Sequence, residues 1–267
     1  MPESLLVPNL QSAGIWLKQR GGVLWQNYPA AYRKLWDRLV AAVAAHPGAA
    51  GSGIISDGEP DWVTSAINSV AGRLTELLFE ELEWTSSSPT TQLGWLERAE
   101  RLLNLPDDQP TFVMPVLTMR LAYLYYRAPD WTEEHVLSKL EGEPEDSVTR
   151  AARAGFLGYG NINYQLFARL RPLLLSLLAQ DCAPPHGYRR IVGILLSAWR
   201  QYDDAGQRLL ASEDLRAALM TASDTDQVMA LNQLQRWHED ATAGPPARAP
   251  LADKLAFLEE VWPRQSF

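Results

Sequence analysis

The sequence predicts an all-α protein, built as an array of antiparallel helical hairpins with an irregular, α-solenoid-like arrangement. Apolar residues recur at intervals of three and four along most of the chain, as they do on one face of an α-helix. No segment shows the convincing alternation of apolar and polar residues that is typical of a half-buried strand. The loops between the expected helices are short, so consecutive helices should pack as antiparallel neighbours. This succession of helices and short loops shows no sequence repeat of fixed length.

The first amphipathic helix is expected over residues 28–46. Its apolar stripe consists of Tyr32, Leu35, Trp36, Leu39, Val40 and Val43. Residues 47–58 are rich in Gly, Ala and Ser, a composition that predicts a flexible linker. We therefore expect N-terminal helices in residues 1–46, a linker at 47–58 and a helical array over 59–267, although all three can belong to one domain.

Further helices follow from the same periodicity. They are expected at 60–83, 92–105, 111–126, 132–140, 144–156, 162–178, 185–202, 212–221, 224–237 and 251–261. The segment 111–126 is apolar on almost every side, so we expect it at the centre of the core. Thr132, followed by Glu133 and Glu134, predicts the N-terminal cap of the next helix.

Composition and charge narrow the class of protein and the kinds of partner that are expected. The 267 residues are 46% hydrophobic and 21% charged, which is typical of a globular protein with a sizeable core. The formal net charge is -8, so we expect no nucleic-acid partner. The Lys and Arg residues look dispersed, and the adjacent pair Arg189 and Arg190 is the nearest approach to a basic patch.

The single cysteine, Cys182, fits a reducing compartment, and we expect a cytoplasmic protein. The N-terminus lacks the pattern of a signal peptide. The most apolar long stretch is interrupted by Arg120, so no membrane-spanning helix is expected.

Motifs for catalysis and cofactor binding are missing from the sequence. None of the four lysines follows a glycine, as a phosphate-binding P-loop requires, and no Gly-x-Ser-x-Gly elbow occurs. No histidine has a Glu three residues before it, as in a di-iron bundle. His238 and Glu239 begin like a zinc-protease helix, but Thr242 stands where the second histidine is needed. We therefore expect no enzyme, no cofactor and no metal site.

Two glycine clusters have two possible interpretations, a ligand-binding loop or a purely structural role. Gly51, Ser52 and Gly53 resemble part of a dinucleotide-binding loop, but they follow a helical pattern instead of a strand, which favours a linker. The glycines between 155 and 160 precede a helix whose first amides can hold an anion, but helix ends also require glycine. We expect a linker at the first cluster and a helix-end turn at the second.

Ten tryptophans are spread over the chain. Their simplest role is to fill contacts between helices. The alternative is that some serve as binding anchors, because Trp and Arg are enriched at interface hot spots. On that alternative, the candidate partner-binding residues are Trp131, Arg189, Arg190 and Trp237.

Four segments carry a resemblance to a known family. They are Trp95–Leu103, Tyr125–Thr132, Leu215–Leu219 with Leu234–Trp237, and Phe257–Gln265. Over about residues 62–265 the chain resembles uncharacterised helical domains that lie downstream of sirtuin-like NAD-consuming domains in bacterial antiphage-defence proteins. The resemblance implies a sensing or assembly role, with NAD cleavage in the separate domain. It carries over no functional residue, and no sirtuin-like domain is recognisable in this sequence.

Three functions remain as hypotheses. The first, which we favour, is a non-catalytic helical module that binds a protein partner, with a sirtuin-like NAD-consuming domain as a candidate. The second is an enzyme with an unfamiliar helical active site, which requires a deep pocket with convergent polar groups. The third is a structural fragment of a larger multidomain protein.

Overall fold

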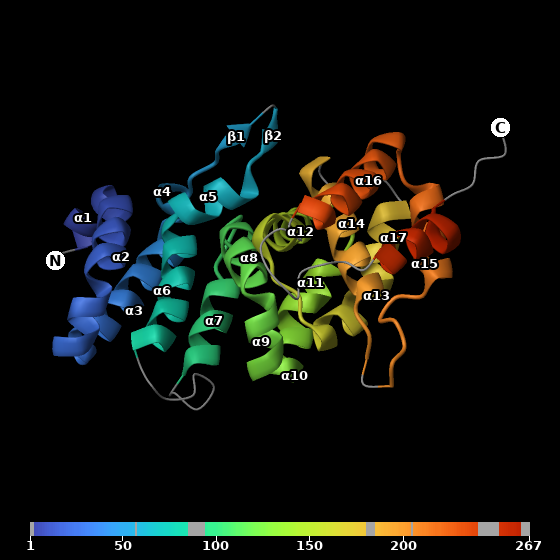
Figure 1. Cartoon of the computed structure of the whole chain (residues 1–267). Coiled ribbons are helices and arrows are strands. Elements are labelled where there is room, and N and C mark those ends of the chain that lie inside the picture. The colour runs from blue at the N-terminus through green and yellow to red at the C-terminus, as the bar shows by residue number, and fades with distance from the viewer. Residues whose placement is uncertain are drawn as a thin grey trace. The chain divides into compact units, whose positions relative to one another are not determined.

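The computed structural model describes residues 3–56, 58–84, 94–179, 185–203, 205–239 and 251–262. Most of these residues are helical, and the predicted all-α class is confirmed (Figure 1). The described residues contain one small antiparallel hairpin, in which Ile55 pairs with Pro60 and Ser56 pairs with Glu59. The solenoid-like arrangement stays a prediction.

The chain divides into two compact units, Met1–Asn161 and Ile162–Phe267. The elements of unit 1 are α1 Glu3–Leu6, η1 Val7–Asn9, α2 Leu10–Asn27, α3 Pro29–Ala45, α4 Pro47–Ala50, β1 Ile55–Ser56, β2 Glu59–Pro60, α5 Trp62–Asn68, α6 Val70–Trp84, α7 Trp95–Leu103, α8 Pro110–Met119, α9 Leu121–Arg127, α10 Pro129–Thr132, the π-helix η3 Glu133–Leu137, α11 Ser138–Leu140 and α12 Ser147–Tyr159. Those of unit 2 are α13 Tyr164–Ala179, α14 Pro185–Arg200, α15 Ser212–Thr221, α16 Asp224–Glu239, α17 Leu251–Ala256 and the π-helix η5 Phe257–Val261.

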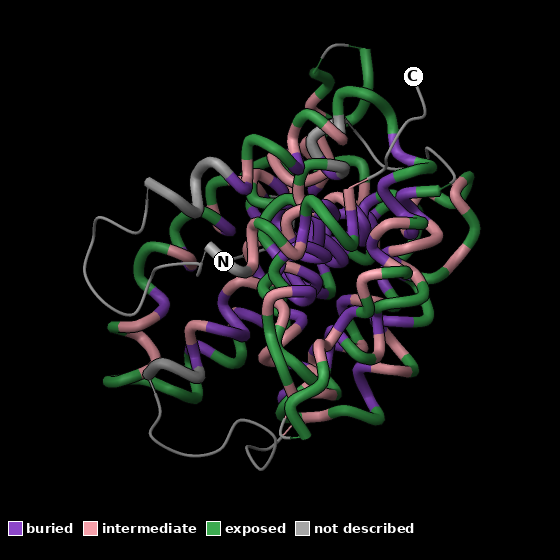
Figure 2. Tube along the Cα trace, turned by 45° about the vertical axis from the view of Figure 1, so that its right-hand side comes forward, coloured by how far each residue is buried: buried purple, intermediate pink, exposed green. Residues whose placement is uncertain are grey.

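At the N-terminal end of unit 1, α2 and α3 form a helical hairpin that packs against α6. The predicted stripe on α3 is largely confirmed, since Tyr32, Trp36, Leu39 and Val43 are fully buried. The indole nitrogen of Trp36 donates to the Leu74 carbonyl at 3.4 Å. Figure 2 shows the same division along many helices, with one side buried and the other exposed. Burial of a single face therefore fixes how α3 is oriented.

The segment expected to be a linker lies inside unit 1. Residues 47–58 include α4 and the first strand of the hairpin, and Asp57 is outside the described residues. The side-chain amide of Gln11 donates to the carbonyls of Ala50 and Gly51 at 2.9 and 3.2 Å. Because α2 and α3 pack on α6, helices on both sides of this segment share one core. The division between compact units comes after Asn161 instead.

The centre of unit 1 is the contact of α8 with α12 and α5. Residues Thr111–Thr118 are all buried, as expected for the core, but the predicted helix over 111–126 is interrupted at Arg120 into α8 and α9. Gly155 of α12 lies directly against α8. A Cβ atom at Gly155 would come within 2.4 Å of the Pro115 carbonyl oxygen and of the Thr118 hydroxyl oxygen. The two helices can approach so closely only because Gly155 has no side chain.

Helix α12 begins with a side-chain cap. The Asp146 carboxylate accepts hydrogen bonds from the backbone amides of Val148 and Thr149 and from the Thr149 hydroxyl. Burial alone raises the pKa of Asp146, but these hydrogen bonds, together with the charge of Lys139, outweigh it and lower the pKa below its usual value.

Further along α12, Arg153 is 6% exposed and holds the end of the preceding helix. Its Nε donates to the Leu140 carbonyl at 3.1 Å, and its Nη2 donates to the Gly142 carbonyl at 2.8 Å. The guanidinium thereby satisfies carbonyls at the C-terminal end of α11.

The prediction that Thr132 caps the N-terminus of a helix is wrong. Thr132 has helical backbone angles at the end of α10, and its hydroxyl donates to the Ala128 carbonyl at 2.7 Å. The helix continues as a π-helical turn over Glu133–Leu137, so no new N-terminus exists there for Thr132 to cap.

Unit 2 is built from α13 to α17 and η5. Helix α13 buries one apolar face, which consists of Leu166, Phe167, Leu170, Leu174, Leu177 and Leu178. Helix α14 packs on α13, α15 and α16, while α15 packs on η5. Arg208 closes the loop before α15, since its guanidinium lies 4.0 Å from the Trp199 ring centroid and donates to the Trp199 carbonyl at 2.7 Å.

Candidate interaction surface

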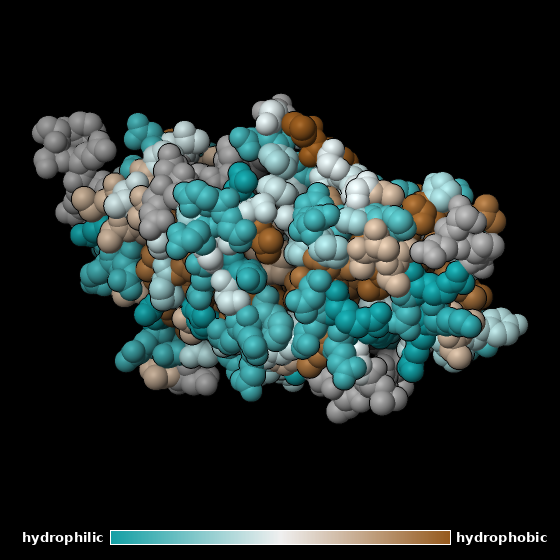
Figure 3. All heavy atoms as spheres, turned by 180° about the vertical axis from the view of Figure 1, so that it is seen from behind, coloured by the Kyte–Doolittle hydropathy of each residue, from teal (hydrophilic) through white to brown (hydrophobic). Residues whose placement is uncertain are grey.

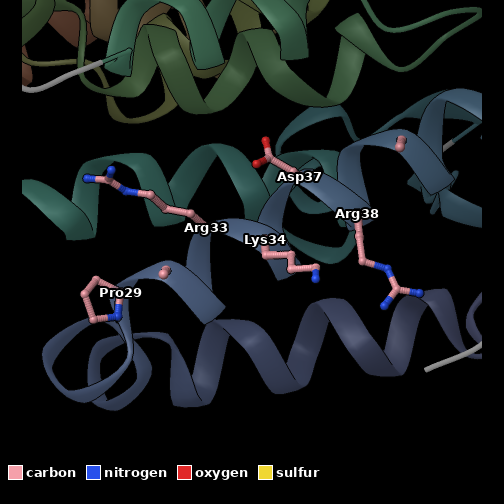
Figure 4. Close-up of a pocket in the computed structure, with 7 residues that line it drawn as sticks. Pro29, Arg33, Lys34, Asp37 and Arg38 are labelled. Atoms are coloured by element: carbon pink, nitrogen blue, oxygen red, sulfur yellow. The ribbon is translucent and has the colours of Figure 1, made fainter.

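A hollow lies on the outer side of α3 in unit 1 (Figure 4). Its volume is about 740 Å³, and all seven lining residues are exposed. We call it the α3 groove, and it is lined by Pro29, Ala30, Arg33, Lys34, Asp37, Arg38 and Ala41.

The sequence spacing explains the shape of the α3 groove. One row of lining residues, at 29, 33, 37 and 41, and a second row, at 30, 34 and 38, each advance by four residues. Rows of this spacing form the ridges on a helix surface, with a furrow between them. In Figure 4, Arg33 and Asp37 extend to one side of α3, while Lys34 and Arg38 extend toward the opposite side. The furrow therefore has charged walls.

A buried polar network anchors the opposite face of α3. The Tyr32 hydroxyl donates to Glu81 at 2.8 Å, and Arg98 binds the same carboxylate through two nitrogens at 2.8 and 2.5 Å. Glu81 is only 2% exposed. Burial, followed by the charge and the hydrogen bond of Glu81, raises the pKa of Tyr32 well above its usual value. Tyr32 thus stays neutral and keeps α3 in place beneath the groove.

Aromatic rings support the charged rim. The Arg33 guanidinium lies 5.2 Å from the Trp25 ring centroid, a cation–π distance that steadies this long side chain. Asp37 is bound to Arg101 of α7 at 2.7 Å, so a neighbouring cation offsets its charge. Arg101 also lies over the buried Trp36 ring, at 5.4 Å. The exposed face of α3 is consequently basic on balance.

The charge of the α2–α3 region was missed by the reasoning from the sequence. Residues 10–50 contain five basic residues and one acidic residue, in a chain whose net charge is -8. The basic residues looked dispersed because no more than two are adjacent, but three of them fall on one face when α3 is wound as a helix. Counting charge over each expected hairpin would have found this surface.

Exposed apolar side chains accompany the basic ones on the same hairpin. On α2, Ile15 is 41% exposed, Trp16 49% and Val23 59%. Trp16 and Val23 are seven residues apart, so both lie on one side of α2. On the face of the molecule seen in Figure 3, hydrophilic side chains predominate and hydrophobic ones form scattered patches. The α2–α3 hairpin therefore combines Trp with Arg and Lys at its surface.

Trp131 belongs to unit 1 and is 8% exposed. Its indole nitrogen donates to Glu100 at 2.8 Å, and its ring stacks on His135 with 4.9 Å between centroids. It also meets Trp95 edge to face at 6.3 Å. Its role in partner binding stays a prediction, and these contacts favour the alternative, a packing role with a satisfied indole nitrogen.

The remaining candidate residues are in unit 2. Arg189 is exposed and Arg190 is half-buried, both on α14. Arg189 borders a small hollow of about 60 Å³ between α14 and α16, which also includes Val192, Gly193, Met229, Asn232 and Gln233. The backbone of Trp237 is part of α16, but its side chain lies outside the described residues. Arg189 therefore lines this hollow, whereas Arg190 does not.

Neither glycine cluster shows the geometry of a ligand loop. Gly51 follows α4, and no strand leads into it. Gly158 lies within α12, and at the start of α13 the Asn163 side chain accepts a hydrogen bond from the Leu166 amide at 2.9 Å. An amide that an anion would need is therefore occupied by the chain itself.

Two features are absent from the described part of the chain. No group of three or more His, Cys, Asp or Glu side chains is arranged to hold a metal ion. None of the described helices combines the length and apolar character needed to cross a membrane. Comparison with known proteins found no matching family model, curated protein or solved structure.

Proposed function

We propose that the chain is a non-catalytic helical interaction module that binds a protein partner through the α2–α3 hairpin. One observation carries this proposal: the α3 groove exposes Arg33, Lys34 and Arg38 on a chain whose net charge is -8. Surfaces that bind proteins are enriched in Arg and Trp, and here Trp25 lies against Arg33.

The chemistry of the groove favours a protein over a nucleic acid. Non-specific binding to DNA grows with the number of phosphates neutralised, and typical contacts involve many cations. The α3 groove has three cations and includes a carboxylate, Asp37, in one of its walls. Because Arg101 offsets the charge of Asp37, the groove offers only a few cations in a mixed surface, which suits a protein partner better than the many phosphates of a nucleic acid.

The α3 groove lacks the features of an enzyme active site. It is open along one exposed helix face, whereas small-molecule sites enclose most of their ligand among convergent groups. Tyr32 and Asp146, whose pKa values are shifted, are both occupied by hydrogen bonds within the fold, and neither lines the groove. We therefore favour binding over catalysis.

The resemblance to helical domains of bacterial antiphage-defence proteins supplies a biological setting. We propose a sirtuin-like NAD-consuming domain as the partner, in the cytoplasm, with this chain as the sensing or assembly component. NAD cleavage would then belong to the partner.

Photo-crosslinking in cells tests the proposed function. A photoreactive amino acid replaces Lys34 in the groove, and in a matched control it replaces Lys139, an exposed lysine of α11. We expect position 34 to yield an adduct with a discrete protein that is missing at position 139. No protein adduct at position 34, or the same adducts at both positions, contradicts the proposed function. A partner other than a sirtuin-like domain retains the module and refutes only the defence setting.

A further inference from the structure

We infer that two copies of the chain associate through the outer face of α2, with the two α2 helices packed antiparallel about a twofold axis. The contact lies outside the α3 groove, so this self-association goes beyond the proposed function. It is supported by the charge of the exposed face of α2, by the sizes of the side chains along it and by the area that it can bury.

The exposed face of α2 has the composition of an interface. Helix α2 packs on α6 and α3 with its other side, and in Figure 1 it lies at one edge of unit 1. We call the exposed row on its outer side the α2 seam, and it consists of Ser12, Ile15, Trp16, Gln19, Val23 and Gln26. The outer side of a solvated helix is normally rich in charged residues, whereas the core of a protein interface is depleted in them. The α2 seam contains no charged residue.

The two cations of α2 lie beside the seam. Lys18 is bound to Glu76 and Glu80 of α6. At about 100° per residue, Arg20 lies about 90° around the helix from the middle of the seam, so it can remain in water when the seam is covered. An acidic or a basic surface gains no ion pair within the seam. Charge therefore favours an equally uncharged occupant, and the α2 seam of a second copy supplies one.

The spacing of the seam favours a helix as the occupant. Ser12, Gln19 and Gln26 form one row with an interval of seven residues, and Trp16 and Val23 form a second. A row with this interval stays on the side that faces one neighbouring helix along its whole length. The seam extends over about four turns, or roughly 21 Å.

The sizes of the side chains favour an antiparallel copy of α2. Large residues, Ile15 and Trp16, occupy one end of the seam, and the half-buried Gly22 lies next to Val23 near the other end. With the twofold axis at Gln19, the large pair of each copy lies opposite Gly22 and Val23 of the other. Large residues against small ones fill a helix contact without voids. A parallel pair would instead crowd two Trp16 rings together and leave a gap between two glycines.

The area of the seam is sufficient for a weak dimer. Trp16 is 49% exposed, Val23 59% and Ile15 41%. With the three polar residues, the seam exposes roughly 500 Å² in each copy, so a dimer removes roughly 1,000 Å² from water. This is about the lower limit for a specific interface, and we expect a reversible dimer with a Kd of roughly 10–100 µM.

Sedimentation equilibrium of the whole chain tests the self-association over about 1–500 µM. We expect the wild type to change from monomer to dimer within this range. Val23→Glu places a carboxylate in the apolar contact and should weaken the dimer by at least about tenfold. Ile55→Glu is the matched control, because it makes the same change at a residue that is 72% exposed on β1, and it should leave the Kd unchanged. Circular dichroism verifies that both variants are folded.

Cysteine crosslinking in a Cys182→Ser background tests the orientation. Gln19→Cys places two thiols at the twofold axis and should give a disulfide-linked dimer on mild oxidation. Ser12→Cys alone should not, because the two positions lie roughly 21 Å apart in an antiparallel pair and a disulfide requires Cα atoms within about 7 Å. A mixture of Ser12→Cys and Gln26→Cys chains should crosslink, since these positions face each other.

Three results would overturn the inference. They are a chain that stays monomeric throughout the concentration range, equal effects of Val23→Glu and Ile55→Glu, and a disulfide that forms with Ser12→Cys as readily as with Gln19→Cys. A monomeric chain whose position 23 photo-crosslinks to a different protein assigns α2 to that protein instead. Because the adduct expected at position 34 does not require a dimer, failure of the self-association can be distinguished from failure of the proposed function.

Discussion

Replacement of Gly155 by Ala should destabilise unit 1, although alanine is the better helix former. The added methyl group would lie 2.4 Å from the Pro115 carbonyl oxygen, 2.4 Å from the Thr118 hydroxyl oxygen and 2.5 Å from the Pro115 Cα. Unstrained carbon–oxygen contacts are about 3.3 Å or longer, so α8 and α12 must separate by about 1 Å. Backbone atoms of α8 cannot rotate away as a flexible side chain does.

The size of the effect follows from two opposing contributions. Overpacking of a dense core costs about 1–3 kcal/mol, and we expect the upper end because the clash involves backbone. Exchange of Gly for Ala within a helix contributes about 1 kcal/mol in the opposite direction. The free energy of unfolding should therefore fall by about 2 kcal/mol.

Urea unfolding followed by circular dichroism measures this change, with Gly158→Ala as the matched control. Gly158 lies in the same helix, but its nearest contact for an added Cβ is Val63 Cγ2 at 3.9 Å, an ordinary van der Waals distance. We expect the control to be neutral or stabilising by up to about 1 kcal/mol. If Gly155→Ala is as stable as Gly158→Ala, the close contact of α8 with α12 is refuted.

Other variants test polar contacts of unit 1 in the same unfolding assay. Asp146→Ala should cost about 1 kcal/mol at pH 7. The pKa of Asp146 is lower in the folded state than the value of about 3.9 in the unfolded state. Asp146 therefore stabilises the fold fully above that unfolded pKa, and this stabilisation is lost as the pH falls through the folded pKa. If the stability difference between wild type and Asp146→Ala is unchanged at about pH 2, the cap is contradicted. Arg98→Met should cost about 3–5 kcal/mol because it leaves the Glu81 carboxylate buried without its cation, and a cost under about 1 kcal/mol would show that Glu81 is not a buried anion. Arg153→Met should cost about 2 kcal/mol through two orphaned carbonyls, and wild-type stability would contradict that role.

Helix faces could be predicted because burial of one stripe is a local property of the sequence. The spacing of Tyr32, Trp36, Leu39 and Val43 alone indicated the buried side of α3, and all four are buried. The core position of residues 111–118 followed from apolar character on every side. These features need no knowledge of which helix packs on which.

Features that depend on tertiary contacts could not be predicted. Thr132 has the sequence of an N-terminal cap, but the preceding helix continues through it as a π-helical turn, and its hydroxyl bonds back to Ala128. The segment after α3 is rich in small residues and reads as a linker, yet Gln11 of α2 binds its backbone. Local composition does not reveal such long-range partners.

The candidate surface was only partly accessible to sequence reasoning. Arg33 and Lys34 are adjacent, but three residues separate Lys34 from Arg38, and the three cations come together only on the helical surface of α3. The neutralisation of Asp37 requires Arg101, which is distant in the sequence. Trp131 was selected for its residue type, but burial against Glu100 and His135 depends on how α7 and α10 pack.

The central claim is that the α3 groove is the contact surface for a protein partner. The most direct test is the affinity of the partner crosslinked at position 34, measured by titration calorimetry against wild type, Lys139→Glu and the double variant Lys34→Glu with Arg38→Glu. We expect wild type and Lys139→Glu to bind equally and the double variant to bind at least about tenfold more weakly. Equal affinity for all three proteins would contradict the claim.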